Sequence, residues 1–235
     1  MMKIFFLPFA GGNKYSYRPF MRHDTDNLAI EVLEYAGRGA RSHEALPLYL
    51  GAMVDDVASQ LQKKAAGAAY CVYGHSMGAL LACLATRKLR SSGDVLSTRL
   101  FVSGLPGPAA LSIYGRKRHL MDKENFLKEV ARYGNFSSDM FDEELLSYLE
   151  PILRSDFRAI ETYRYVTEAP LPVSMTVFAG AGDEDTSDAG LLLWQQETQW
   201  PVEIIKMPGS HFFIFNNVRG MLKIMSEQLT NKIVL

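Results

Sequence analysis

Residues 70–84, YCVYGHSMGALLACL, constrain the fold of this chain more than any other stretch. Strand-favouring apolar residues run into Gly-His-Ser-Met-Gly at 74–78, and a helix-forming run follows without a break. This order predicts a strand, a sharp turn and a helix, the arrangement called a nucleophile elbow. The turn would expose the Ser76 hydroxyl above the sheet, and the helix would direct its N-terminal N–H groups toward it. We therefore predict that Ser76 is a catalytic nucleophile; the alternative is a glycine-rich turn around a buried serine.

Length and composition limit what this elbow can belong to. The chain has 235 residues, 48% hydrophobic and 22% charged, which suits a single α/β domain over residues 1–235. A formal net charge of −1 provides no basic field for nucleic acid or for an anionic membrane. The apolar run 4–10 is too short for the core of a signal peptide, and Cys71 and Cys83 fit small core residues better than a disulfide. We expect a cytoplasmic protein with no nucleic-acid and no membrane partner.

Apolar segments of strand length alternate with helical patterns along the chain. Apolar residues recur at helical spacing from Met53 to Leu61, and again from Val218 to Leu229. Strands that alternate with helices predict an α/β fold with a mostly parallel central sheet flanked by helices. The predicted strands are Lys3–Phe9, Ala29–Tyr35, Tyr70–Tyr73, Arg99–Ser103, Val173–Ala179 and Val202–Met207.

One long stretch interrupts this alternation. Residues 109–158 contain no convincing strand pattern, and two helical patterns begin near Asp122 and Asp142, each a suitable N-cap. Pro151 should kink or divide the second helix. Because the insertion falls between two core strands on the side toward which the elbow points, it predicts a lid over about residues 108–158. Its apolar faces could line an acyl channel, or they could pack only on each other.

Two polar loops follow the last two predicted strands. The first is the acidic loop GAGDED at 180–185, and the second is PGSHFF at 208–213. Since the carboxyl ends of parallel strands meet at one edge of a sheet, both loops should lie near Ser76. The chain order Ser, Asp, His is the order used by hydrolases with a nucleophile elbow. We therefore predict His211 as the general base.

The acidic loop offers two candidates for the carboxylate that orients His211. Asp183 comes directly off the strand, where the backbone geometry is best determined, so we favour it. Asp185 is the alternative, and Glu184 between them is expected to be solvated. The chosen carboxylate would hold the imidazole in the correct tautomer and stabilise the imidazolium.

The loop that leaves the first strand, PFAGGN at 8–13, should also face the site. In elbow hydrolases such a loop supplies one N–H of the oxyanion hole, and the residue after the nucleophile supplies the other. Ala10 and Met77 are therefore the predicted oxyanion-hole residues. The alternative is a plain Gly-Gly turn.

A second glycine-containing loop, GRGAR at 37–41, follows the next predicted strand. It is expected to be a flexible loop, and it carries two cations. We expect it to be a solvated basic turn.

Five motifs occur in order along nearly the whole chain: PFAGG at 8–12 followed by YRPF at 17–20, GRGAR at 37–41, GHSMG at 74–78, LRSDF at 153–157 and GSHFF at 209–213. Together they resemble the type II thioesterases, the free-standing editing thioesterases of non-ribosomal peptide and polyketide assembly lines. The resemblance implies an α/β-hydrolase fold with a helical lid, and hydrolysis of acyl groups from the phosphopantetheine arm of carrier proteins. Ala36 stands where that family usually has a proline, and the acidic loop lacks the usual Asp-Pro. The second departure leaves the choice between Asp183 and Asp185 open.

Acyl or peptidyl carrier proteins are the partners that this resemblance implies. The substrate would bring its own phosphopantetheine, so we expect no cofactor and no metal, and we expect a monomer. Two alternative enzymes, a small-molecule carboxylesterase and a medium-chain fatty acyl thioesterase, would use the same catalytic residues. A non-catalytic binding module is the alternative of another class, and the complete set of Ser76, Asp183 and His211 argues against it.

Overall fold

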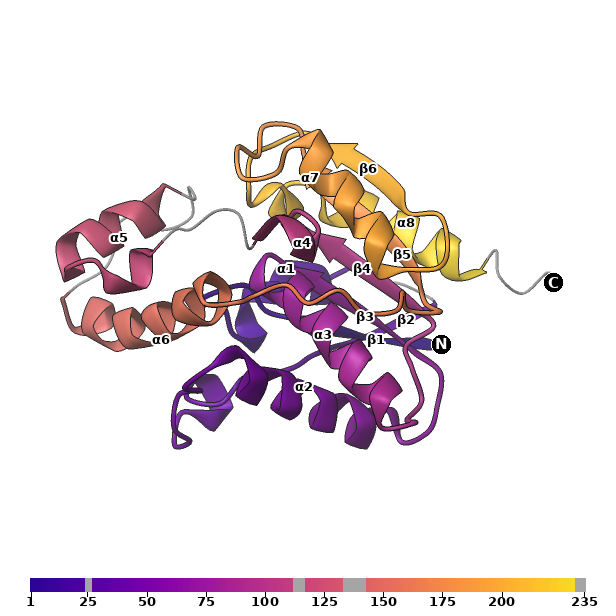
Figure 1. Ribbon diagram of the computed structural model, residues 1–235, viewed down its shortest axis with the longest axis horizontal. Coiled ribbons are helices and arrows are strands. Elements are labelled where there is room, and N and C mark those ends of the chain that lie inside the picture. Colours follow the sequence, from indigo (N-terminus) through magenta and orange to yellow (C-terminus); the bar gives the residue numbers. More distant parts are fainter. Residues whose placement is uncertain (24–26, 112–116, 133–142, 231–235) are drawn as a thin grey trace.

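The computed structural model describes residues 1–23, 27–111, 117–132 and 143–230. Within these residues, six parallel strands form one sheet in the order β2-β1-β3-β4-β5-β6 (Figure 1). The predicted α/β class is confirmed, although the first two strands end earlier than expected. The strands are β1 Met2–Leu7, β2 Leu28–Val32, β3 Tyr70–His75, β4 Arg99–Ser103, β5 Ser174–Gly180 and β6 Glu203–Met207.

Helices cover both faces of this sheet. Helices α2 (Leu50–Ala65) and α3 (Met77–Ser91) pack on one face, and α1 (Arg18–Met21) and α8 (Val218–Thr230) pack on the other. No described helix is both long and apolar enough to cross a bilayer. The remaining helices are α4 Pro108–Leu111, α5 Lys123–Ala131, α6 Glu143–Glu161 and α7 Asp188–Leu192.

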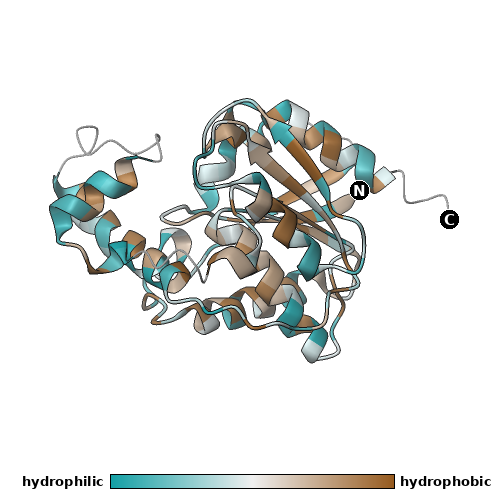
Figure 2. Ribbon diagram, turned by 45° about the horizontal axis from the view of Figure 1, so that its top comes forward, coloured by the Kyte–Doolittle hydropathy of each residue, from teal (hydrophilic) through white to brown (hydrophobic). Residues whose placement is uncertain are grey.

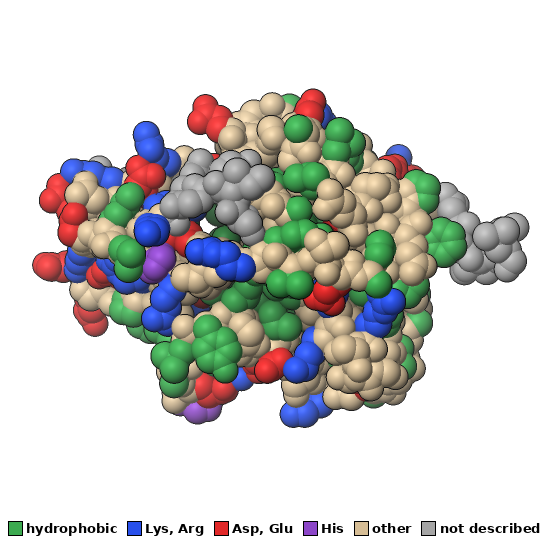
Figure 3. All heavy atoms as spheres, viewed as in Figure 1, with side chains coloured by type: hydrophobic (Ala, Val, Ile, Leu, Met, Phe, Trp, Pro, Cys, Tyr) green, Lys and Arg blue, Asp and Glu red, His purple; other side chains and the backbone are tan. Residues whose placement is uncertain are grey.

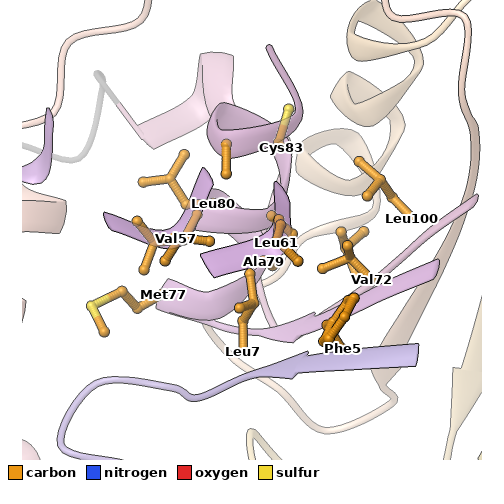
Figure 4. Close-up of a cluster of buried hydrophobic side chains, with 14 of the residues drawn as sticks. Phe5, Leu7, Val57, Leu61, Val72, Met77, Ala79, Leu80, Cys83 and Leu100 are labelled. Atoms are coloured by element: carbon orange, nitrogen blue, oxygen red, sulfur yellow. The ribbon is translucent and has the colours of Figure 1, made fainter. Parts of the chain in front are cut away.

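Strand β1 shows how the sequence builds the two layers. Its side chains alternate, so that Phe5 and Leu7 join the core beneath α2 and α3 while Ile4 and Phe6 join the core on the α8 side. Figure 4 shows Phe5 and Leu7 beside side chains of α2 and α3. The strands are mostly hydrophobic, with hydrophilic residues toward some of their ends, whereas the flanking helices carry more hydrophilic residues (Figure 2). Cys71 and Cys83 are buried free thiols in these cores, as predicted.

The predicted helical insertion lies between β4 and β5 in the chain. Figure 1 shows α5 and α6 side by side, extending beyond the edge of the sheet. They share a small hydrophobic cluster of their own, separate from the two cores of the body. Its buried members are Phe126, Leu127, Val130, Leu153 and Phe157.

The ends of these two helices test the capping predictions. Asp122 caps α5, because its side chain accepts a hydrogen bond from the Asn125 N–H at 3.0 Å. Asp142 lies outside the described residues. Of the two outcomes predicted at Pro151, a kink or a division, the division does not occur, since α6 continues through it to Glu161. Proline removes one hydrogen bond within the helix. Buried residues follow it and hold the next turns against the rest of the protein: Ile152, Leu153, Ser155, Asp156, Phe157 and Ala159.

Candidate active site

Ser76 stands between β3 and α3 in a conformation that L-residues rarely adopt, with φ 53° and ψ −117°. Such a backbone costs about 1–3 kcal/mol and persists only where its surroundings impose it. Its N–H is held by the Ser103 carbonyl of β4 at 2.8 Å. The strain supports the elbow interpretation, because a strained turn is how this motif presents its nucleophile.

The two glycines of the elbow are required by close packing. A Cβ at Gly74 would lie 2.1 Å from the Gly78 carbonyl oxygen, and a Cβ at Gly78 would lie 2.2 Å from the carbonyl oxygen of Leu7. Neither glycine has a positive φ. The sharp turn is therefore taken by Ser76 itself, and the glycines let α3 approach β3 and the end of β1 closely.

Asp183 and His211 meet beyond the ends of β5 and β6. Asp183 Oδ2 lies 3.0 Å from His211 Nδ1, and both residues are buried. The two loops are joined by a backbone hydrogen bond from the Gly182 N–H to the Gly209 carbonyl at 2.9 Å. A Cβ at Gly180 would lie 2.6 Å from the Ser210 carbonyl oxygen. The contact between the loops thus depends on glycine as well as on the paired side chains.

Asp185, the alternative candidate for the acid, lies beside this pair, and its backbone contacts Asp183. Its backbone N–H donates to Asp183 Oδ1 at 3.1 Å, which helps to orient the Asp183 carboxylate. Glu184 is exposed, as predicted. Side-chain ligand atoms of Asp183, Asp185 and His211 lie within 4.8 Å of one another, which is close enough for a metal ion. His211 Nδ1 already contacts the Asp183 carboxylate. We therefore interpret His211 as a general base that Asp183 orients, in preference to a metal ligand.

The elbow and the histidine loop are neighbours. The rings of His75, next to Ser76, and His211 are 5.0 Å apart between centroids. The structure therefore brings Ser76, Asp183 and His211 to the same edge of the sheet. This is the arrangement expected from the three strand ends.

His75 is a residue of the site that sequence reasoning did not single out. It is fully buried, and its Nδ1 lies 2.8 Å from Ser103 Oγ, which also lies 2.8 Å from the Tyr73 hydroxyl. Burial, and secondarily the nearby His211, holds the pKa of His75 well below its ordinary value. His75 is therefore neutral, so it does not oppose a positive charge on His211. Gly104 makes room for the ring, since a Cβ there would lie 2.3 Å from His75, but this contact is visible only in the folded structure.

The loop after β1 lies against the first turn of α3. The Gly12 N–H donates to the Phe9 carbonyl at 2.8 Å, and Gly11 between them has φ +75°. Among the described residues, no hydrogen bond is made by the N–H of Ala10 or by the N–H of Met77. Both predicted oxyanion-hole donors are therefore available.

The GRGAR loop differs from its prediction. We expected a solvated basic turn, but Arg38 is only 2% exposed and donates to both oxygens of Asp156 in α6, at 2.6 and 2.7 Å. Arg41 also forms ion pairs, with Glu44 and Asp56. The prediction was wrong because the partner that makes burial of Arg38 possible lies 118 residues away in the sequence.

Comparison with known proteins agrees with this geometry. A family model described as "Thioesterase domain" matches residues 2–229. The gramicidin S biosynthesis protein GrsT of Aneurinibacillus migulanus is 28% identical over 229 residues, which cover 97% of this chain and 89% of GrsT.

Two solved structures have closely similar folds. ClbQ from the colibactin NRPS/PKS pathway has a TM-score of 0.90 at 26% identity, with 100% of this chain and 99% of ClbQ covered. The RedJ thioesterase from the prodiginine biosynthetic pathway in Streptomyces coelicolor has a TM-score of 0.87 at 27% identity, with 96% of this chain and 85% of RedJ covered. The likeness thus extends over nearly the whole chain.

Proposed function

The chain belongs to the thioesterase domain family, and we propose that it is a free-standing type II thioesterase that hydrolyses acyl groups from the phosphopantetheine arm of carrier proteins. The observation that carries the mechanism is the 3.0 Å contact between Asp183 and His211 next to the strained Ser76 elbow. The carrier-protein substrate is supported by the likeness to GrsT, ClbQ and RedJ, whose names place them in biosynthetic pathways. Removal of acyl groups from carrier proteins suggests that the enzyme has an editing role in such a pathway.

The proposed reaction has two acyl-transfer steps. Nδ1 of His211 faces Asp183, and we assign Nε2 as the nitrogen that takes the Ser76 proton. Ser76 Oγ attacks the thioester carbonyl, the C–S bond breaks, and His211 returns the proton to the departing thiolate of the carrier protein. Water then attacks the acyl-Ser76 ester with His211 again as base, which releases a carboxylic acid and restores Ser76.

The negative charge that develops on the carbonyl oxygen in both steps needs donors. We propose that the N–H groups of Ala10 and Met77 bind this oxyanion, because neither has another partner among the described residues. The N-terminus of α3 adds its positive dipole end. Removing one such donor from an acyl-transfer enzyme costs on the order of 10²–10³ in kcat.

The insertion is proposed to act as the lid over the acyl chain. Leu145 and Tyr148 of α6 are 39% and 49% exposed, so the helix offers apolar surface that the protein itself does not cover. The carrier protein would supply the pantetheine arm, so the proposed chemistry requires no cofactor or metal held by the enzyme. A soluble carrier protein as partner is compatible with action in the cytoplasm.

Intact-mass measurement of acyl-loaded carrier proteins tests this function. The wild-type enzyme should convert acyl-carrier to the free-thiol form, and Ser76→Ala should lower the rate by at least about 10⁴-fold. The matched control is Ser42→Ala, which removes an exposed serine hydroxyl elsewhere. Both variants should fold normally, as judged by circular dichroism and melting temperature.

Three results would contradict the proposal in different ways. Undiminished hydrolysis by folded Ser76→Ala would remove Ser76 as nucleophile. Faster turnover of free small esters than of acyl-carrier would indicate a carboxylesterase, and a preference for fatty acyl chains of eight or more carbons, on the order of 10²-fold, would indicate a medium-chain fatty acyl thioesterase.

A further inference from the structure

The loop that carries Ala10 is fixed by a side chain from the far end of the sequence. The Gly11 N–H donates to Asp156 Oδ2 at 2.8 Å, and Asp156 is completely buried in α6. We propose that Asp156 is a positioning residue for the oxyanion hole, and that Arg38 is the counter-ion that makes this possible. The inference rests on the proposed function, because it assumes that Ala10 binds the oxyanion.

Asp156 acts on the part of the loop that is easiest to reorient. The Gly12-to-Phe9 hydrogen bond and the φ of +75° at Gly11 are those of a type II β-turn over residues 9–12. In such a turn the central peptide, here between Ala10 and Gly11, can flip to give the other common turn type. Its N–H is the group that Asp156 accepts. The carboxylate therefore holds this peptide in one orientation, which fixes ψ of Ala10. The Ala10 N–H belongs to the preceding peptide, whose Phe9 carbonyl the same turn holds through the hydrogen bond from the Gly12 N–H.

Arg38 holds the carboxylate in place from the other side. It donates from two nitrogens to the two oxygens of Asp156, and its Nη1 lies 3.4 Å from the Gly12 carbonyl oxygen. Burial alone would lower the pKa of Arg38, but Asp156 outweighs it and the pKa is raised above its ordinary value. Arg38 therefore stays charged, and it contacts the same turn that Asp156 fixes.

The charge of the pair suits this position. The Asp156 carboxylate contacts Gly11, the residue next to the proposed oxyanion donor Ala10. Without a counter-ion, its negative charge would oppose the negative charge of the transition state. With Arg38 bound to both oxygens, the net charge of the pair is zero. Asp156 can thus accept the Gly11 N–H without this penalty, which explains why a buried arginine accompanies it.

A second side chain of α6 meets the same turn. A Cβ at Gly11 would lie 2.4 Å from Leu153 Cδ2, and Leu153 and Asp156 are three residues apart on one helical face. The hydroxyl of the neighbouring Ser155 donates to the Pro47 carbonyl at 2.8 Å, which anchors this part of α6 to the body. Helix α6 therefore connects the proposed lid directly to the oxyanion loop.

The chain contains a matched control for this arrangement. Arg87 and Glu197 form another buried ion pair, at 2.5 Å, with side chains 7% and 1% exposed. This pair joins α3 to the segment after α7, and within the described part of the chain its hydrogen bonds include those to Cys83 and Ala169 and none to residues 8–13. Loss of either pair should destabilise the protein, but loss of the Arg38–Asp156 pair should also affect the oxyanion hole.

The experiment compares Asp156→Asn with Glu197→Gln, at a temperature where both variants are folded. Asp156→Asn should lower kcat by about 10- to 100-fold with KM within about twofold, since a displaced donor acts in the transition state more than in the ground state. An alkylboronic acid, whose tetrahedral adduct with Ser76 places an oxygen in the oxyanion hole, should bind more weakly by a similar factor. Glu197→Gln should leave kcat, KM and boronate affinity at the wild-type values.

Arg38→Lys keeps the test decisive if Asp156→Asn does not fold. Lysine retains the charge but cannot make the bidentate contact with Asp156, so kcat should fall by about 3- to 10-fold with KM unchanged. The control variant Arg87→Lys should not change kcat. Wild-type kcat and boronate affinity in folded Asp156→Asn or Arg38→Lys would overturn the inference. Undiminished hydrolysis by Ser76→Ala would instead overturn the proposed function, so the two failures are distinguishable.

Discussion

The loops at the strand ends and the helical insertion are held together in different ways. Backbone hydrogen bonds between neighbouring strands and loops fix the first region, as from Ser76 to Ser103 and from Gly182 to Gly209. The insertion stands beyond the sheet (Figure 1) and packs around the small cluster between α5 and α6. Side-chain hydrogen bonds of Asp156 and Ser155 join α6 to the body. Figure 3 shows many charged side chains gathered over this region. The proposed catalytic residues thus lie in the region that backbone hydrogen bonds hold in place.

The two regions are suited to two different tasks, catalysis and acceptance of the acyl chain. Catalysis needs groups held to within fractions of an ångström, which strand ends and buried side chains provide. Acceptance of varied acyl chains needs a surface that can adjust, which a small separate cluster allows. The Asp156 contact with Gly11 is where the two regions meet.

The largest expected effect concerns the loops at the strand ends. Asp183→Asn should lower kcat by about 10⁴-fold, because the amide favours the wrong tautomer of His211. Asp185→Asn should be mild, within about tenfold, because the Asp185 contact with Asp183 comes from its backbone N–H. Steady-state hydrolysis of acyl-carrier protein measures both. The reverse ranking of the two variants would assign the acid to Asp185.

A smaller effect should show that the insertion unfolds separately from the body. Phe126→Ala removes a fully buried ring of the α5–α6 cluster at a cost of about 3–5 kcal/mol. Hydrogen exchange measured by mass spectrometry should accelerate in peptides of α5 and α6 and remain unchanged in the sheet.

The matched control is Phe101→Ala in β4, an equally buried ring of the body. It should lower the melting temperature by on the order of 10 °C and accelerate exchange throughout the chain. If Phe126→Ala also accelerated exchange in the sheet strands, the two regions would form one cooperative unit and the comparison would fail.

The smallest effect is expected across a series of acyl groups. Apolar walls discriminate by only about 1–3 kcal/mol per methylene, or about 10- to 200-fold. With an adjustable lid we expect the low end of this range, so that short acyl chains on one carrier protein that differ by one carbon should be hydrolysed at rates within about tenfold of one another. Single-turnover hydrolysis of the loaded carriers measures this. A preference above about a thousandfold between chains differing by one or two carbons would show a shaped pocket in place of an adjustable lid.

Much of the site follows from short patterns in the sequence. The strand-turn-helix signal placed Ser76, and the two loops after strands placed Asp183 and His211, because each depends on residues within a few positions. The roles of the elbow glycines were less visible. Gly74 lies close to the Gly78 carbonyl, and Gly78 lies close to the Leu7 carbonyl. Both contacts arise only when α3 packs against β1 and β3.

The buried polar groups could not be predicted in the same way. His75 looked like an ordinary residue of the motif, and its neutral state follows from complete burial in the assembled core. Arg38 looked solvated because its loop contains no apolar side chain that would suggest burial. Whether a charge can be buried depends on a partner, and nothing near Arg38 in the sequence indicates one.

The sequence by itself determined the alternation of strands and helices, the elbow and the order of the three catalytic candidates. These are local patterns, and parallel strands bring their carboxyl ends together whatever the details of packing. Only the tertiary structure decided that Asp156 reaches Gly11 across 145 positions and pairs with Arg38. That contact depends on how α6 docks against the body, and docking is set by the fit of whole surfaces rather than by any short run of residues.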